Sequence, residues 1–186
     1  MRANPARGVV VVAHPDDESM WCGGLLARYR DCWTVICCSI PRIDPIRAYK
    51  FFEACEVLGA RGRLLPFTET DFRTPIGNLS HLDLSGYDTI VTHNALGEYG
   101  HRHHMDLHKY IVERWRDKVM TIGYGDGSPP GVTITLTEEE HAIKMAAIKC
   151  YNHVSPTDGR PKWEALLARY GEKFNMGVET YTCLGT

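Results

Sequence analysis

The stretch "VVVVAHPDDESMWCGG", residues 9–24, decides the fold of this chain. It opens as a continuous apolar, β-branched run, which is typical of a strand covered on both faces of a sheet. It closes as a helix-like segment, and a histidine, a proline and three consecutive acids stand between the two. Pro15 restricts the backbone of His14, so we expect a shaped turn there rather than the interior of a helix.

Strand-like and helix-like segments alternate along the rest of the chain. Apolar stretches predict strands over 8–13, 32–40, 62–67, 87–94, 119–125, 132–136 and 178–184. Helical periodicity predicts helices over 19–31, 46–60, 104–118, 137–154 and 161–174. Pro66 indicates an edge strand at 62–67, and a polar stretch, 68–86, follows it. The alternation predicts one α/β domain over 1–186 with a mainly parallel sheet.

Composition and charge exclude several classes of protein. The chain has 186 residues, of which 44% are hydrophobic and 24% charged, as in ordinary globular domains. Its 21 basic and 23 acidic residues nearly balance, so nothing points to a nucleic-acid or acidic-membrane partner. No apolar run approaches the roughly 20 residues that span a bilayer, and the run after the basic N-terminus is too short for a secretory signal. Seven cysteines without a C-x-x-C spacing are expected to stay reduced, so we expect a cytoplasmic protein.

The turn at residues 13–18 carries carboxylates where a parallel strand is expected to end. In open parallel sheets, ligands bind outside the carboxyl ends of the strands. Three adjacent ionised acids repel one another unless positive charge is near. The N-terminus of the following helix offers part of that charge, and a divalent cation would offer far more. The alternative is that Asp16 or Asp17 only caps the helix and His14 is a polar residue satisfied within the fold.

The segment 93–108 holds five of the nine histidines and follows another expected strand. His101 and His104 are three residues apart and His104 and His108 four apart, so each pair can share one helical face. Neutral imidazoles at such spacings are ready metal ligands, although histidine-rich stretches are also often plain polar loops. If the two loops converge, a His and an Asp from the first and a His from the second would bind zinc and leave a position for water. That arrangement is typical of a hydrolase.

At these residues the sequence resembles the PIG-L/LmbE family, metal-dependent N-deacetylases that remove acetyl groups from amino sugars. The segment "VVVVAHPDDE", residues 9–18, matches the family's first motif in full. The segment "VTHNALGEYGHRHH", residues 91–104, matches the second motif except that His103 stands where the family usually has Asp or Asn. Weaker matches begin at Arg47 and in the segment 144–155. The resemblance implies a Rossmann-like three-layer α/β/α fold, and zinc or another divalent metal as the cofactor.

The resemblance also divides the site into metal ligands and catalytic groups. As metal ligands it implies His14, Asp17 and His104. As catalytic groups it implies the general base Asp16, the acid or electrophilic partner His101, and Tyr99, which would help to polarise the acyl oxygen. Spacing alone does not separate Asp16 from Asp17. The implied reaction is hydrolysis of an N-acyl amide, most simply an N-acetyl group on an amino sugar or sugar conjugate, by zinc-activated water.

Three further residues are candidates for substrate binding, namely Arg47, Arg42 and Trp21. The arginines could grip a phosphate or sugar hydroxyls, and the tryptophan could stack on a sugar. Each also has a plainer interpretation, as a solvated charge or a packing residue. Specificity is expected to lie in the loops 41–46, 68–86 and 124–131, which carry no readable signature.

Several other residues keep open roles. His108 rivals His101 as a metal ligand by its spacing, and His93 could support the site or lie at the surface. In the family, the acid that His103 replaces is placed to orient the preceding imidazole. Either Asp106 or another acid takes over that role here, or His101 works as a neutral group.

Two rival functions remain open. An amidase that cleaves a thiol-conjugate or nucleoside-linked amide would use the same residues. A non-enzymatic sugar-binding domain is disfavoured because the expected base, Asp16, is retained. No G-x-G-x-x-G follows the first strand and no H-E-x-x-H occurs, which disfavours a nucleotide-binding Rossmann protein and a zinc protease. We expect a small N-acylated sugar as the partner, with neither nucleic acid nor membrane, and the sequence leaves a homo-oligomer open.

Overall fold

The computed structural model describes residues 7–69, 76–124, 131–156, 159–170 and 177–185. Seven strands of this part form the main sheet, in the order β4-β2-β1-β6-β7-β9-β8. Their bounds are Gly8–Val12 (β1), Trp33–Cys37 (β2), Arg61–Leu64 (β4), Thr89–Thr92 (β6), Val119–Ile122 (β7), Val132–Thr135 (β8) and Val178–Cys183 (β9). The first five in this order run parallel, whereas β9 is antiparallel to both β7 and β8. The predicted α/β class with a mainly parallel sheet is confirmed.

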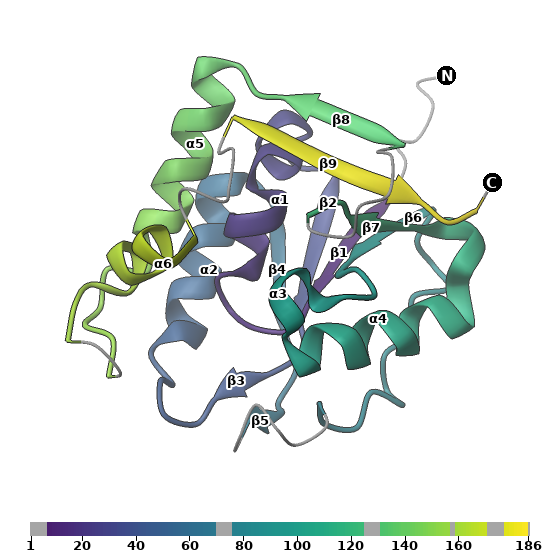
Figure 1. The fold of residues 1–186 in the computed structure, drawn as a ribbon, viewed down its shortest axis with the longest axis horizontal. Coiled ribbons are helices and arrows are strands. Elements are labelled where there is room, and N and C mark those ends of the chain that lie inside the picture. Colours follow the sequence, from purple (N-terminus) through teal and green to yellow (C-terminus); the bar gives the residue numbers. More distant parts are fainter. Residues whose placement is uncertain (1–6, 70–75, 125–130, 157–158, 171–176, 186) are drawn as a thin grey trace.

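Helices cover both faces of the sheet (Figure 1). Helices α1 (Asp17–Arg28), α2 (Arg47–Leu58) and α5 (Glu138–Lys149) pack against one another on one face, and α4 (Arg102–Trp115) covers the other. Val10 and Val12 of β1 belong to the core under the first group, whereas Val9 and Val11 belong to the core under α4. A strand whose residues are all buried on both sides explains the continuous apolar run in the sequence. The three-layer arrangement implied by the family resemblance is confirmed.

The smaller elements lie around this sandwich. Two short strands, β3 (Ile40–Pro41) and β5 (Thr68–Glu69), form a separate parallel pair. The remaining helices are α3 (Gly97–Gly100), the 3₁₀ turn Arg116–Lys118, and α6 (Lys162–Tyr170). The expected helix continues to residue 174, but residues 171–174 lie outside the described part.

Several expected boundaries were wrong. The apolar stretch 32–40 forms two strands, because β2 ends at Cys37 and β3 begins at Ile40. The helix that begins after the Thr137–Glu140 capping box is confirmed at its start but ends at Lys149. Beyond it, the buried Tyr151 hydroxyl donates to Glu18 at 2.7 Å. The chain beyond α5 is therefore held by a long-range contact, where local periodicity predicted further helical turns.

The connection after β4 carries part of the core. Leu79, Leu82 and Leu84 are buried among the residues under α4, although their surroundings in the sequence are polar. The edge position of β4 is confirmed, and Pro66 lies just beyond the strand. The isolated leucines were missed because three apolar residues in a polar stretch give no clear period.

Strands β1 and β6 are neighbours, and this places two loops side by side. Val11 pairs with Thr92, so Ala13–His14 and His93 leave the sheet at the same edge. The chain runs from β1 outward through β2 to β4 and then returns to β6 on the other side of β1. Such a reversal of strand order opens a crevice at the carboxyl ends of the two central strands.

Candidate active site

The turn between β1 and α1 holds its two aspartates in different directions. Asp16 adopts a left-handed backbone conformation with φ of 105°, which is strained for any residue but glycine. The turn is held by two hydrogen bonds, from the His14 backbone N–H to Asp17 Oδ2 (2.9 Å) and from the Asp16 backbone N–H to Glu18 Oε2 (3.0 Å). Asp17 consequently points toward a cluster of histidines and Asp16 toward α2.

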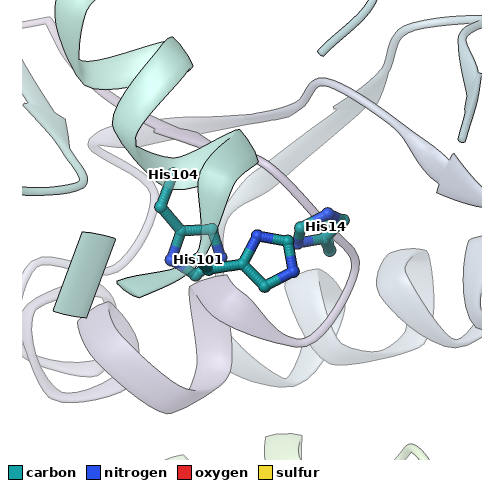
Figure 2. A group of neighbouring side chains, drawn as sticks. All are labelled: His14, His101 and His104. Carbon is teal, nitrogen blue, oxygen red and sulfur yellow. The ribbon is translucent and has the colours of Figure 1, made fainter. Parts of the chain in front are cut away.

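Asp17 lies at the centre of three imidazoles. Its Oδ2 is 3.4 Å from His14 Nδ1, 3.3 Å from His104 Nε2 and 3.5 Å from His93 Nε2. All four side chains are buried, and the ligand atoms form two overlapping groups that could hold a metal ion, His14–His101–His104 and Asp17–His93–His104. Figure 2 shows the rings of His14, His101 and His104 clustered where α4 meets the β1–α1 loop. The imidazoles outweigh the effect of burial and hold the pKa of Asp17 well below its usual range.

The spacing of these atoms fits a metal ion. Ligand bonds of about 2.0–2.1 Å in a tetrahedron separate neighbouring ligand atoms by about 3.3–3.4 Å. Asp17 Oδ2 stands at 3.4 Å from His14 Nδ1 and at 3.3 Å from His104 Nε2, within that range. The Nε2 atom of His104 is buried and has no hydrogen-bond partner among the described residues. A buried carboxylate oxygen and an unpartnered ring nitrogen at this distance are suited to share a cation.

Asp16 is paired with Arg47, the first residue of α2. The guanidinium Nη2 is 2.5 Å from Asp16 Oδ2 and also donates to the backbone oxygen of Pro15. Burial raises the pKa of Asp16, and the charge of Arg47 opposes that rise. Arg47 is itself buried, so it lies against the expected base rather than in the solvent.

His101 begins helix α4 as its N-cap and lies next to the candidate metal ligands. Its ring centroid is 4.7 Å from that of His14 and 4.6 Å from that of His104. Its Nδ1 accepts a hydrogen bond from the His103 backbone N–H at 3.3 Å. Burial and the neighbouring imidazoles lower the pKa of His101 to about 3. The geometry therefore favours a neutral ring that carries its proton on Nε2.

His103 contacts His14 as well as approaching His101. Its Nδ1 is 3.0 Å from His14 Nε2, and the His103 and His101 ring centroids are 5.3 Å apart. Asp106, the expected substitute for the missing acid, interacts with Arg102 (3.5 Å) and with the Ile76 backbone N–H (3.3 Å). This arrangement favours the alternative in which His101 works as a neutral group.

The remaining candidates lie around this cluster. Trp21 is buried, its ring centroid lies 6.4 Å from that of Tyr99 and 5.1 Å from that of Tyr124, and Tyr99 is 40% exposed. Arg42 is exposed in the loop before α2. His108 donates its Nδ1–H to the His93 backbone oxygen at 2.9 Å and belongs to neither metal group. Of the loops expected to set specificity, residues 70–75 and 125–130 lie outside the described part.

Sequence reasoning missed Glu98. This buried side chain lies at a kink in α3, with φ of 57°, and its Oε2 contacts His93 Nδ1 (2.9 Å) and His104 Nδ1 (2.5 Å). The signal in the sequence was slight, since Glu98 is the one acid between residues 93 and 104.

Comparison with known proteins identifies the class. The model of the family described as "PIG-L: GlcNAc-PI de-N-acetylase" matches residues 9–115, more than half of the chain. The chain belongs to this family, which confirms the resemblance seen in the two motifs.

A curated relative is similar to most of this chain over part of its own length. A 1D-myo-inositol 2-acetamido-2-deoxy-alpha-D-glucopyranoside deacetylase of Actinosynnema mirum is 28% identical over 155 residues, which cover 82% of this chain and 45% of that protein. The chain thus spans about half the length of this curated relative.

Two solved structures share the fold. The N,N'-diacetylchitobiose deacetylase of Pyrococcus horikoshii has a TM-score of 0.66 at 19% identity, over 95% of this chain and 83% of that one. The 4-carboxy-2-hydroxymuconate hydratase GalB of Pseudomonas putida KT2440 has a TM-score of 0.53 at 17% identity, over 95% of both chains. Since one neighbour is a deacetylase and the other a hydratase, the fold by itself does not decide the reaction.

Two further observations concern the helices and the cysteines. Within the described ranges, every helix is too short or too polar to cross a bilayer. All seven cysteines are free thiols, as expected from their spacing.

Proposed function

We propose that this protein is a metal-dependent hydrolase that removes an N-acyl group, most simply N-acetyl, from an amino sugar or sugar conjugate. The observation that carries the proposal is the spacing of His14 Nδ1, Asp17 Oδ2 and His104 Nε2 beside the buried carboxyl of Asp16. Family membership and the deacetylase named among its relatives support the same reaction class.

The metal would be held by His14, Asp17 and His104. A bound divalent ion, for which we propose Zn²⁺, would polarise the acyl carbonyl and lower the pKa of water toward about 7. Two imidazole nitrogens and one carboxylate are a ligand set that zinc accepts while leaving a position for substrate or water. His93 is excluded from this role because its Nε2 accepts the Ala13 backbone N–H and its Nδ1 contacts Glu98. His108 is excluded because it belongs to neither group of candidate ligand atoms.

Asp16 would be the group that moves protons, and His101 would be a hydrogen-bond donor. Asp16 takes the proton of the attacking water, and Arg47 holds its Oδ2 so that Oδ1 can face the substrate. His101, neutral and protonated on Nε2, donates a hydrogen bond to the oxyanion that forms at the acyl carbon. Because a neutral imidazole is a donor rather than an acid, we assign protonation of the leaving amine to Asp16. Tyr99, half-exposed beside His101, would add a second donor to the acyl oxygen.

The substrate would be a small N-acylated sugar, bound against the exposed ring of Tyr99, with Trp21 packed behind that ring. Aromatic faces suit the apolar faces of sugar rings. Arg42, exposed before α2, would serve a phosphate or hydroxyls if the substrate carries them, whereas Arg47 would act on the substrate only through Asp16. The free thiols fit a reducing compartment, so we propose a cytoplasmic location.

The test is metal analysis of the purified protein together with amine release from a panel of N-acetylated sugars. Asp16→Ala should retain the metal and lower turnover by roughly 10²–10⁴-fold, the usual contribution of a general base. Asp117→Ala, at an exposed aspartate, is the matched control. Thiol-conjugate and nucleoside-linked amides form a second arm, and turnover confined to that arm would favour the amidase. No bound metal and no amine release from either arm would refute the proposal.

A further inference from the structure

Glu98 joins two of the buried histidines through one carboxylate oxygen. Its Oε2 lies 2.9 Å from His93 Nδ1 and 2.5 Å from His104 Nδ1, and its Oε1 accepts the Asn94 backbone N–H at 3.0 Å. The residue sits in a backbone conformation with φ of 57° and ψ of −60°, which a glutamate adopts only when its surroundings fix it. This strained backbone indicates that the contacts of the buried carboxylate fix its position.

A backbone amide decides which nitrogen of His93 carries the proton. The Ala13 N–H is 3.1 Å from His93 Nε2, and a backbone N–H can only donate. His93 Nε2 therefore presents its lone pair to Ala13, and the ring proton resides on Nδ1. That proton is donated to Glu98. His93 has no lone pair left for a metal, although it is as near to Asp17 as the other two rings are.

The same carboxylate then decides the proton on His104. Glu98 Oε2 is an acceptor, so the Nδ1 atom of His104 at 2.5 Å carries a proton toward it. Neutral imidazole has one proton, which leaves His104 Nε2 with its lone pair. This is the buried atom that has no hydrogen-bond partner in the described part of the chain and that faces Asp17 Oδ2 at 3.3 Å.

We propose that Glu98 is a positioning residue that fixes His93 and His104 in the same Nδ1–H tautomer, so that only His104 presents a ring nitrogen to the metal. The inference rests on the proposed metal site. Without the carboxylate, His104 can carry its proton on Nε2 and donate it to Asp17. The ring nitrogen then has no lone pair directed at the site, so it cannot bind a cation. Substitution of a residue that hydrogen-bonds to a metal ligand typically lowers metal affinity by roughly 10–100-fold.

The decisive variant is Glu98→Gln, which keeps the size of the side chain. The amide has one uncharged oxygen and one NH₂ group in place of two carboxylate oxygens. It therefore either turns its NH₂ toward both imidazole Nδ1–H groups, or turns it toward the Asn94 backbone N–H and offers the imidazoles a weaker, uncharged acceptor. Zn²⁺ affinity, measured by competition with a chelating dye, should fall roughly 10–100-fold. Glu113→Gln, an exposed glutamate on α4, is the matched control and should bind Zn²⁺ as the unchanged protein does.

The second measurement needs no variant. ¹⁵N NMR of the imidazoles in the metal-free protein, recorded over a pH series up to the point where the ring signals stop changing, reports which nitrogen of each neutral ring carries the proton. The expected result is Nδ1–H for both His93 and His104, with the His104 signal changed in Glu98→Gln. A proton on Nε2 of His104 in the unchanged protein, or undiminished Zn²⁺ affinity in a folded Glu98→Gln, would overturn the inference.

These outcomes separate the inference from the proposed function. A protein that binds Zn²⁺ through His104 but releases no amine would contradict the proposed reaction and leave the role of Glu98 intact. An active enzyme whose His104 carries its proton on Nε2 would contradict the role of Glu98 and leave the proposed reaction intact.

Discussion

Lys144 and Glu179 form a buried ion pair next to helix α1, and breaking this pair should destabilise the fold strongly. Lys144 Nζ is 2.7 Å from Glu179 Oε1, and both side chains are almost fully buried. The same carboxylate also accepts the backbone N–H groups of Gly24 (2.7 Å) and Leu25 (2.8 Å) in α1, and the Tyr181 hydroxyl at 2.8 Å. Strand β9 thereby anchors the middle of the helix whose first turn carries Asp17.

The size of the effect follows from this geometry. Lys144→Met preserves the length of the side chain but leaves a carboxylate in the core without its cation, which costs about 3–5 kcal/mol. Glu179→Gln leaves the ammonium unpaired and turns an amide donor toward one of the α1 N–H groups, so a similar loss is expected. Each single substitution leaves the other charge buried without a partner. The double variant should therefore lose less stability than the sum of the two single losses, by at least about 2 kcal/mol.

Urea unfolding of the four proteins at neutral pH measures this coupling. The free energy of unfolding follows from the midpoint and slope of each two-state transition. Lys109→Met, at an exposed lysine of α4, is the control and should change stability by less than about 0.5 kcal/mol. The reasoning fails if Lys144→Met costs less than about 1 kcal/mol, or if the two losses simply add.

Two further predictions concern α1. Hydrogen bonds from Arg28 lower the pKa of Glu140 to about 2 from 4.5, so the ionised carboxyl stabilises the fold above pH 4.5 and loses that effect as the pH falls toward 2. Arg28→Met should therefore lower the urea midpoint at neutral pH and have little effect at about pH 2, and equal losses at both would contradict the pairing. Gly24→Ala would place a Cβ 2.3 Å from a Leu136 methyl carbon and should cost about 1–3 kcal/mol. Gly86→Ala, where a Cβ meets nothing within 4 Å, is the control, and equal thermal stability of the two variants would show that α1 has room to shift.

Local patterns in the sequence determined the class of the fold and the two loops that carry the site. The apolar run of β1, the proline after His14 and the acids that follow are neighbours in the chain, so their consequences can be read without knowing any distant contact. The same holds for the spacing of His101 and His104 on the first turn of α4. The match to a family motif rests on these contiguous residues.

Tertiary structure alone decided which of the clustered groups contact one another. The pairing of Val11 with Thr92 brings the Ala13 backbone N–H to His93 Nε2, a contact between residues 80 positions apart in the chain. Glu98 and Glu179 gave no clear signal because their partners lie on other elements, and a lone acid between glycines or in a strand has no period. The spacing of residues in a sequence specifies which side chains share one turn or one face of a helix. The partner of a buried charge depends instead on strand order and register, which local spacing does not encode.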